Sequence, residues 1–267
     1  MSVRETTLED APAIRQFPFD TDAGVGGRAL IGLIVLASDH TIEYEYRLIL
    51  RELPGVALYE SRIFCDSMIT PDTLRAMEPG IAGCASVILP GTKLDVVGFG
   101  CTSASMVIGQ ERVSELIRSA RPESAATNPV TAAFAAFAAL GAKRIAVLTP
   151  YSDVVNEGIR AYFEAGGVAV PVMGSFKEPN DNIVAKISPA TIAEASVALL
   201  DGADVDALFV SCTSLRLVEV VGELERRTGL PVTSSNHALA WHSLRLAGVD
   251  DRLPQFGRLF ETGLSGK

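Results

Sequence analysis

The chain has 267 residues and a net charge of −9, with 23 Lys and Arg against 32 Asp and Glu. This length allows one large domain or two small ones. The composition, with 48 % hydrophobic and 21 % charged residues, excludes disorder over most of the chain. The acidic balance argues against general binding to nucleic acid or to an anionic membrane surface, since both require a basic face.

Short β-branched runs alternate with longer amphipathic stretches once the chain leaves an irregular arm at 1–27, where the glycine-rich segment 24–27 lies. The pattern predicts strands at 29–37, 55–62, 96–99, 144–148, 168–173, 207–210 and 231–233. It predicts helices at 41–51, 71–85 (broken near Pro79), 104–118, 129–140, 153–165, 188–200, 215–227 and 238–247. Such apolar strands separated by helices indicate parallel sheets covered on both faces and joined by right-handed crossovers.

The segments 94–109 and 205–220 repeat one pattern. In each, an aspartate lies six positions before a cysteine (Asp95 and Cys101, then Asp206 and Cys212), an apolar strand lies between them, and Thr-Ser follows. A unit that occurs twice predicts two similar α/β lobes. Ligands of open α/β sheets bind beyond the carboxyl ends of the strands, so we expect both thiols in one cleft between the lobes.

The position of each cysteine, after a strand and before a predicted helix, favours the thiolate because a helix N-terminus carries partial positive charge. The two motifs also supply hydroxyls that suit a carboxylate: Thr102, Ser103, Thr213 and Ser214. This arrangement predicts proton transfer at a carbon α to a carboxylate, with one thiol on each face. Free cysteines are more often buried structural residues, and that interpretation is kept for Cys65 and Cys84.

No cysteine or histidine spacing fits a zinc site, and no nucleotide-binding or other cofactor motif is complete, so neither metal nor cofactor is predicted. Residues 1–24 lack the apolar core of a signal peptide, and no run of 18 apolar residues occurs. We therefore expect a cytoplasmic protein with reduced thiols and no membrane partner.

Seven segments resemble the aspartate/glutamate racemase superfamily, within it the maleate isomerase and arylmalonate decarboxylase branch, and in particular its ectoine-utilisation members. They are 31–45, 67–80, 98–105, 144–156, 181–183, 210–216 and 234–248. The resemblance implies a two-lobed fold with the active site between the lobes, cofactor-independent chemistry and a homodimer. The organisation expected is an arm at 1–27, a first lobe at 28–125, a second at 126–230, and a return of 231–267 to the first lobe.

The resemblance also assigns residues. The family's paired catalytic cysteines fall on Cys101 and Cys212, a carboxylate-binding tyrosine falls on Tyr151, and an asparagine of the site falls on Asn182. The decarboxylase branch keeps only the second cysteine. The presence of both therefore favours two-face proton transfer, or thiol addition with isomerisation, over decarboxylation.

One position departs from the maleate isomerase pattern. Their first strand ends in Ser-Asn-Thr-Thr, whereas this chain has Asp39 in place of the asparagine, followed by His40. An ionised Asp39 repels an anion and suits an ammonium group, which favours an amino-acid-like substrate. The alternative is that Asp39 caps the helix that follows. His40 and His237 are each open to a cleft role or to a structural one, whereas His242, beside Trp241, is expected to pack in the core.

Three functions remain open. The leading hypothesis is a racemase or epimerase of a small amino-acid-like carboxylate, with ectoine or hydroxyectoine breakdown as its setting. The second is a maleate-type cis-trans isomerase in which a thiol adds to the double bond. The third is a non-catalytic module that binds a small acid.

Overall fold

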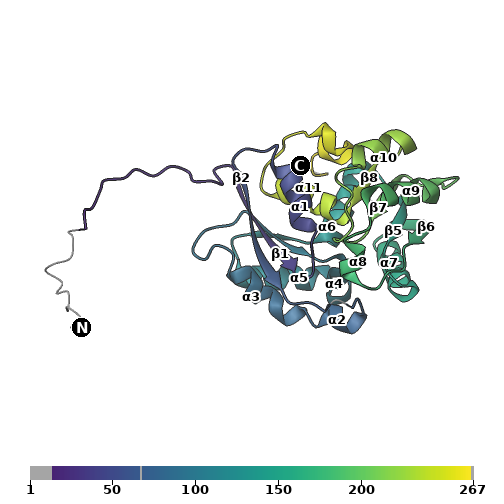
Figure 1. Ribbon diagram of the computed structural model, residues 1–267, viewed down its shortest axis with the longest axis horizontal. Coiled ribbons are helices and arrows are strands. Elements are labelled where there is room, and N and C mark those ends of the chain that lie inside the picture. Colours follow the sequence, from purple (N-terminus) through teal and green to yellow (C-terminus); the bar gives the residue numbers. More distant parts are fainter. Residues whose placement is uncertain (1–13, 67, 266–267) are drawn as a thin grey trace, which may run out of the picture.

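Two four-stranded parallel sheets with the same strand order form the two lobes of the computed structural model, which describes residues 14–66 and 68–265 (Figure 1). The first sheet has the order β2-β1-β3-β4 and contains β1 (Ala29–Leu36), β2 (Val56–Ile63), β3 (Val96–Gly100) and β4 (Ala125–Thr127). The second has the order β6-β5-β7-β8 and contains β5 (Arg144–Thr149), β6 (Ala169–Ser175), β7 (Ala207–Val210) and β8 (Val232–Ser234). The predicted two-lobed α/β fold is confirmed.

Helices cover both sheets. They are α1 (Ile42–Leu50), α2 (Pro71–Arg75), η2 (Glu78–Gly80), α3 (Ile81–Ser86), α4 (Thr102–Ile108), α5 (Gln110–Ala120), α6 (Pro129–Leu140), α7 (Asp153–Ala165), α8 (Asp181–Val184), α9 (Pro189–Leu200), α10 (Val221–Thr228), α11 (Ser235–Leu246), η3 (Pro254–Phe256) and η4 (Arg258–Glu261). None of those in the described ranges is long and apolar enough to cross a membrane. Residues 14–27 reach away from the body as an extended arm (Figure 1).

Two predicted helices were wrong in extent. The helix predicted at 104–118 is two helices, because the chain breaks at Gly109, whose φ of +98° is compatible with glycine but not with a helix. The helix predicted at 215–227 begins only at Val221. The break near Pro79 is confirmed, while β4 and α8 were missed because segments of three and four residues carry too little periodicity.

The repeated aspartates set the alignment of the central strands. Asp95 Oδ2 accepts the backbone N–H of Leu30 at 2.8 Å, which fixes β3 beside β1. Asp206 Oδ2 accepts the backbone N–H groups of Lys143 and Arg144, both at 2.8 Å. These bonds fix β7 beside β5. Each aspartate therefore acts at the amino end of a pair of strands whose carboxyl ends carry the site.

Two helices join the lobes. Helix α6 leaves the first sheet, and its Phe137 packs edge-on against Phe163 and Phe209 of the second lobe at ring-centroid distances of 5.7 and 5.5 Å. Helix α11 leaves the second sheet and packs against α6, α1 and β3, with Trp241 fully buried. Because each of these helices packs against the opposite lobe, the carboxyl ends of both sheets are held toward one another.

Candidate active site

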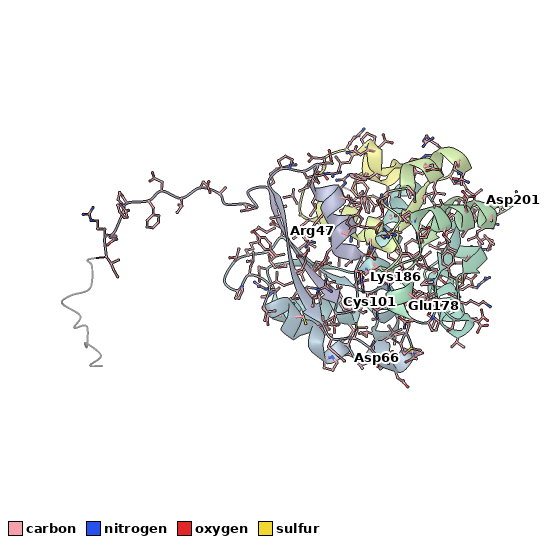
Figure 2. All side chains as sticks on the ribbon, viewed as in Figure 1. Arg47, Asp66, Cys101, Glu178, Lys186 and Asp201 are labelled. Atoms are coloured by element: carbon pink, nitrogen blue, oxygen red, sulfur yellow. The ribbon has the colours of Figure 1, made fainter. Side chains whose placement is uncertain are left out.

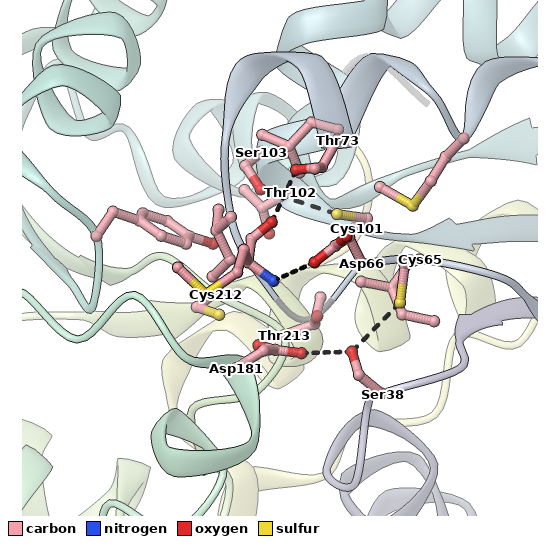
Figure 3. Close-up of a pocket in the computed structure, with 16 residues that line it drawn as sticks. Ser38, Cys65, Asp66, Thr73, Cys101, Thr102, Ser103, Asp181, Cys212 and Thr213 are labelled. Atoms are coloured by element: carbon pink, nitrogen blue, oxygen red, sulfur yellow. Dashed lines mark hydrogen bonds between the residues drawn. The ribbon is translucent and has the colours of Figure 1, made fainter.

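The carboxyl ends of the inner strands of both sheets meet at one pocket (Figure 3). Strands β3 and β7 lead to Cys101 and Cys212, while β1 and β5 lead to Ser38 and Tyr151. Sixteen residues line it: Leu36, Ser38, Cys65, Asp66, Met68, Ile69, Thr73, Leu74, Met77, Cys101, Thr102, Ser103, Tyr151, Asp181, Cys212 and Thr213. The cavity is narrow, with a volume of about 30 Å³.

Cys101 is the N-cap residue of α4, as the sequence predicted. Its Sγ lies 3.8 Å from the Ser103 Oγ, and its side chain is 4 % exposed. Burial nevertheless raises the pKa of this thiol to about 12, against a smaller lowering by the backbone N–H of Ala104 and by Ser103. In Figure 2 the label of Cys101 lies over the body of the protein, whereas the exposed Asp201 lies at its edge.

Cys212 lies in a different environment, and here the prediction of a helix N-terminus was wrong. A series of turns follows it, and α10 begins nine residues later at Val221. The backbone N–H of Ser214 donates to Cys212 Sγ at 3.4 Å. Burial, and then the charge of Asp181, raise the pKa of this thiol well above its usual value. Burial therefore favours the protonated form of both thiols.

Asp181 is a pocket residue that the sequence reasoning missed. It begins α8 and is 5 % exposed. Its Oδ2 accepts the hydroxyl of Ser38 at 2.7 Å (Figure 3). Its Oδ1 accepts the hydroxyl of Ser214 at 2.7 Å, so Asp181 joins the first lobe to the turn after Cys212. The signal was its position directly before Asn182 in a segment that the family resemblance had already singled out.

Three residues assigned to the substrate do not line this pocket, namely Asp39, Asn182 and Ser214. Asp39 caps the start of α1, since its Oδ1 accepts the backbone N–H groups of Thr41 at 2.6 Å and Ile42 at 2.9 Å. Its burial raises its pKa to about 6. Asn182 is turned toward the exposed His40, whose Nε2 lies 2.9 Å from the Asn182 Oδ1. The bonds of Asp39 Oδ1 fit the role at the start of the helix, while its Oδ2 is buried without a hydrogen-bond partner among the described residues.

The remaining candidates divide by what their hydroxyls contact. Ser103, Thr213 and Tyr151 line the pocket. The pKa of Tyr151 lies well above its usual value, because of burial and then the proximity of both thiols. Thr102 also lines the pocket, but its hydroxyl donates to Ser235 Oγ at 2.7 Å. Ser214 does not line the pocket, and its hydroxyl donates a hydrogen bond to Asp181 Oδ1.

Glu45 was also missed, because on the sequence it resembles an ordinary charged residue in the first turns of a helix. It is fully buried, and its Oε1 accepts the backbone N–H groups of Leu217 at 2.6 Å and Val218 at 2.7 Å. Its Oε2 accepts the side-chain amide of Asn236 at 2.8 Å, which also donates to the carbonyl of Thr213 at 2.7 Å. This network fixes the turn that carries Cys212.

His237 and His242 have structural roles. His237 is fully buried between the hydroxyl of Thr233 at 2.9 Å and the carbonyl of Phe256 at 2.7 Å, and burial lowers its pKa to about 4. His242 bonds the hydroxyl of Thr127 at 2.8 Å. Within residues 14–66 and 68–265, no three His, Cys, Asp or Glu side chains are grouped to hold a metal ion.

Comparison with known proteins accounts for this arrangement. A family model described as arylmalonate decarboxylase matches residues 68–260. The chain belongs to this family. It is 30 % identical to the arylmalonate decarboxylase of Bordetella bronchiseptica over 67 % of this chain and 72 % of the relative. It is also 30 % identical to the maleate isomerase of Nocardia farcinica, over 86 % of this chain and 94 % of the relative.

Solved structures of this arylmalonate decarboxylase family share the fold. The maleate isomerase Iso of Pseudomonas putida S16 with maleate superposes with a TM-score of 0.80 at 25 % identity, covering 88 % of this chain and 98 % of that one. The N. farcinica maleate cis-trans isomerase with a covalently bound succinylcysteine intermediate also gives 0.80, at 27 % identity over 87 % and 98 %. The protein is therefore an enzyme of the cysteine-based isomerase type, and a non-catalytic binding module is not supported.

Proposed function

We propose that the protein is a cofactor-independent racemase or epimerase that acts at the α-carbon of a small amino-acid-like carboxylate. The observation that carries this proposal is that the thiols of the two repeated motifs, Cys101 and Cys212, line the same small pocket from different lobes. A planar carbanion intermediate between two acid/base groups can be protonated on either face.

The reaction requires one thiolate and one thiol. The thiolate takes the α-proton and becomes a thiol, while the opposite thiol gives its proton to the other face and becomes a thiolate, so charge and protons balance. The hydroxyls of Ser103, Thr213 and Tyr151 line the pocket and supply donors for the substrate carboxylate, whose negative charge grows toward the enolate in the transition state.

The substrate class is taken from the polar side chains that line the pocket and from the resemblance to ectoine-utilisation proteins. A short, polar compound such as aspartate, 2,4-diaminobutyrate, or an N-acetyl or hydroxy derivative of either belongs to this class. Each pure enantiomer is incubated with the enzyme and analysed by chiral chromatography. Appearance of the opposite enantiomer supports the proposal, and conversion of maleate to fumarate without any change in the amino acids contradicts it.

The second candidate is a maleate-type cis-trans isomerase, favoured by the maleate isomerase of N. farcinica that matches 86 % of this chain. In that reaction one thiolate adds to the double bond, the resulting single bond rotates, and elimination restores the thiolate. Mass spectrometry distinguishes the two, since only this route gives an enzyme heavier by one maleic acid.

A further inference from the structure

The charged side chains that line the pocket are all negative among the described residues. Among the described residues that line it, Asp66 and Asp181 are acidic and none is Lys, Arg or His. Asp66 is exposed and accepts the backbone N–H of Met68 at 2.8 Å. Asp181 is buried, so its carboxylate is the charge that a bound substrate meets.

The partners of Asp181 position it without neutralising it. Both its oxygens accept hydroxyls, from Ser38 and Ser214, at 2.7 Å. Hydroxyls orient a carboxylate, but they carry no net charge. A buried carboxylate is costly unless a cation pairs with it, and the described lining offers none. A positively charged group on the ligand supplies the missing partner.

We propose that Asp181 is the specificity-determining residue that recognises the ammonium group of the substrate. This inference rests on the proposed function and assigns to Asp181 the role that the sequence suggested for Asp39. Asp39 does not line the pocket, and one of its oxygens already accepts two backbone N–H groups at the start of α1.

The same contact activates the thiols. Burial is the main cause of the raised pKa of both Cys101 and Cys212, and the negative charge of Asp181 raises each pKa further. An ammonium group against Asp181 cancels that charge, which favours formation of the thiolate once substrate is bound. A dicarboxylate such as maleate has the opposite effect, because it adds negative charge to a pocket without a cationic side chain among its described lining residues.

Calorimetry measures the binding of two pairs of compounds in which a hydroxyl replaces the α-amino group. The first pair is aspartate and malate, and the second is 2,4-diaminobutyrate and 2-hydroxy-4-aminobutyrate. Each enantiomer is measured separately. The variant is Asp181→Asn, which keeps the shape and can still bond both serines. The control is Asp39→Asn, because Asn caps helices as well as Asp does.

We expect at least one amino compound to bind wild type about tenfold or more tighter than its hydroxy partner. Asp181→Asn removes that preference, leaves the hydroxy compound unchanged or tighter, and Asp39→Asn retains the preference. Equal binding within every pair by wild type overturns the inference, as does equal weakening of both members by Asp181→Asn, or failure of every amino compound to bind.

The inference and the proposed function fail in distinguishable ways. If an amino acid is racemised but Asp181→Asn leaves the preference for the amino compound intact, Asp181 does not recognise the ammonium group. The proposed racemase activity is then still supported. If maleate alone is converted and no amino acid changes, the proposed function is wrong as well.

Discussion

The Oε1 atom of Glu45 accepts the backbone N–H of Leu217 at 2.6 Å, although the two residues are 172 positions apart. The bond runs from α1 of the first lobe to the turn after Cys212 in the second. The first repeat holds its cysteine by a helix that begins at Thr102, whereas the second has no helix there. A buried carboxylate from the other lobe supplies the acceptor that positions the turn.

The variant Glu45→Gln tests this network. The glutamine side chain keeps an acceptor for Leu217 and Val218, but its NH₂ group meets the side-chain amide of Asn236, which is also a donor. We expect the free energy of unfolding to fall by about 1–3 kcal/mol, the cost of a buried unpaired group. Urea unfolding measures it, with the exposed Glu157→Gln as the control.

The same variant changes the pH dependence of stability. Burial raises the pKa of Glu45 from 4.5 to about 7, so the native protein holds this proton more tightly than the unfolded chain does. The stability this confers is fully present below pH 4.5 and is lost as the pH rises through 7. We expect unfolding free energy to decline over that window, and less steeply in Glu45→Gln. An identical slope in both proteins contradicts the assignment.

Alkylation of the ligand-free enzyme tests the burial of the thiols. Cys101 and Cys212 are each 4 % exposed, while Cys65 and Cys84 are partly exposed; burial raises the pKa of Cys84 as it does those of Cys101 and Cys212. At neutral pH we expect iodoacetamide to modify Cys65 and Cys84 about tenfold or more faster, because the reactive form is an accessible thiolate. Peptide mass spectrometry gives the order, and guanidinium should remove the difference. Early modification of Cys101 or Cys212 is inconsistent with the closed pocket.

The sequence predicted the parts of this site that depend on local pattern. The repeated aspartate, strand and Cys-Thr-Ser motif indicated two lobes and led to Cys101 and Cys212. Asp181 and Glu45 escaped detection because their roles come from contacts across the lobes, with Ser38 and with Leu217. No period or spacing encodes such contacts, and the burial that raises both thiol pKa values is equally non-local.

Gly109 gives a test of the break between α4 and α5. No atom lies within 4 Å of the position a Cβ would occupy, yet its φ of +98° is strained for any L side chain. We expect Gly109→Ala to cost about 1 kcal/mol or more of stability. Gly83, in the helix α3 and equally open, is the matched control, and Gly83→Ala should stabilise by up to about 1 kcal/mol. Equal effects on thermal unfolding would show that backbone strain is not responsible.

Tyr151 offers a prediction on catalysis. Removing its hydroxyl in Tyr151→Phe takes a donor from the pocket beside both thiols. We expect kcat to fall about tenfold to a hundredfold with stability nearly unchanged. Tyr46→Phe removes a buried hydroxyl that contacts Ser243 at 3.2 Å in the core instead, so it should cost about 1 kcal/mol of stability and leave kcat as it is. A kcat of Tyr151→Phe equal to wild type would exclude the hydroxyl from the reaction.

The most direct test of the two-thiol mechanism is proton NMR in D₂O with wild type, Cys101→Ser and Cys212→Ser. Each sample holds maleate, both enantiomers of aspartate, glutamate and 2,4-diaminobutyrate, and their N-acetyl and hydroxy derivatives. We expect wild type to exchange the α-proton of at least one amino-acid-like compound for deuterium, and neither variant to interconvert its enantiomers. Full turnover by either variant, or fumarate formed from maleate with every α-proton retained, would contradict the two-thiol mechanism.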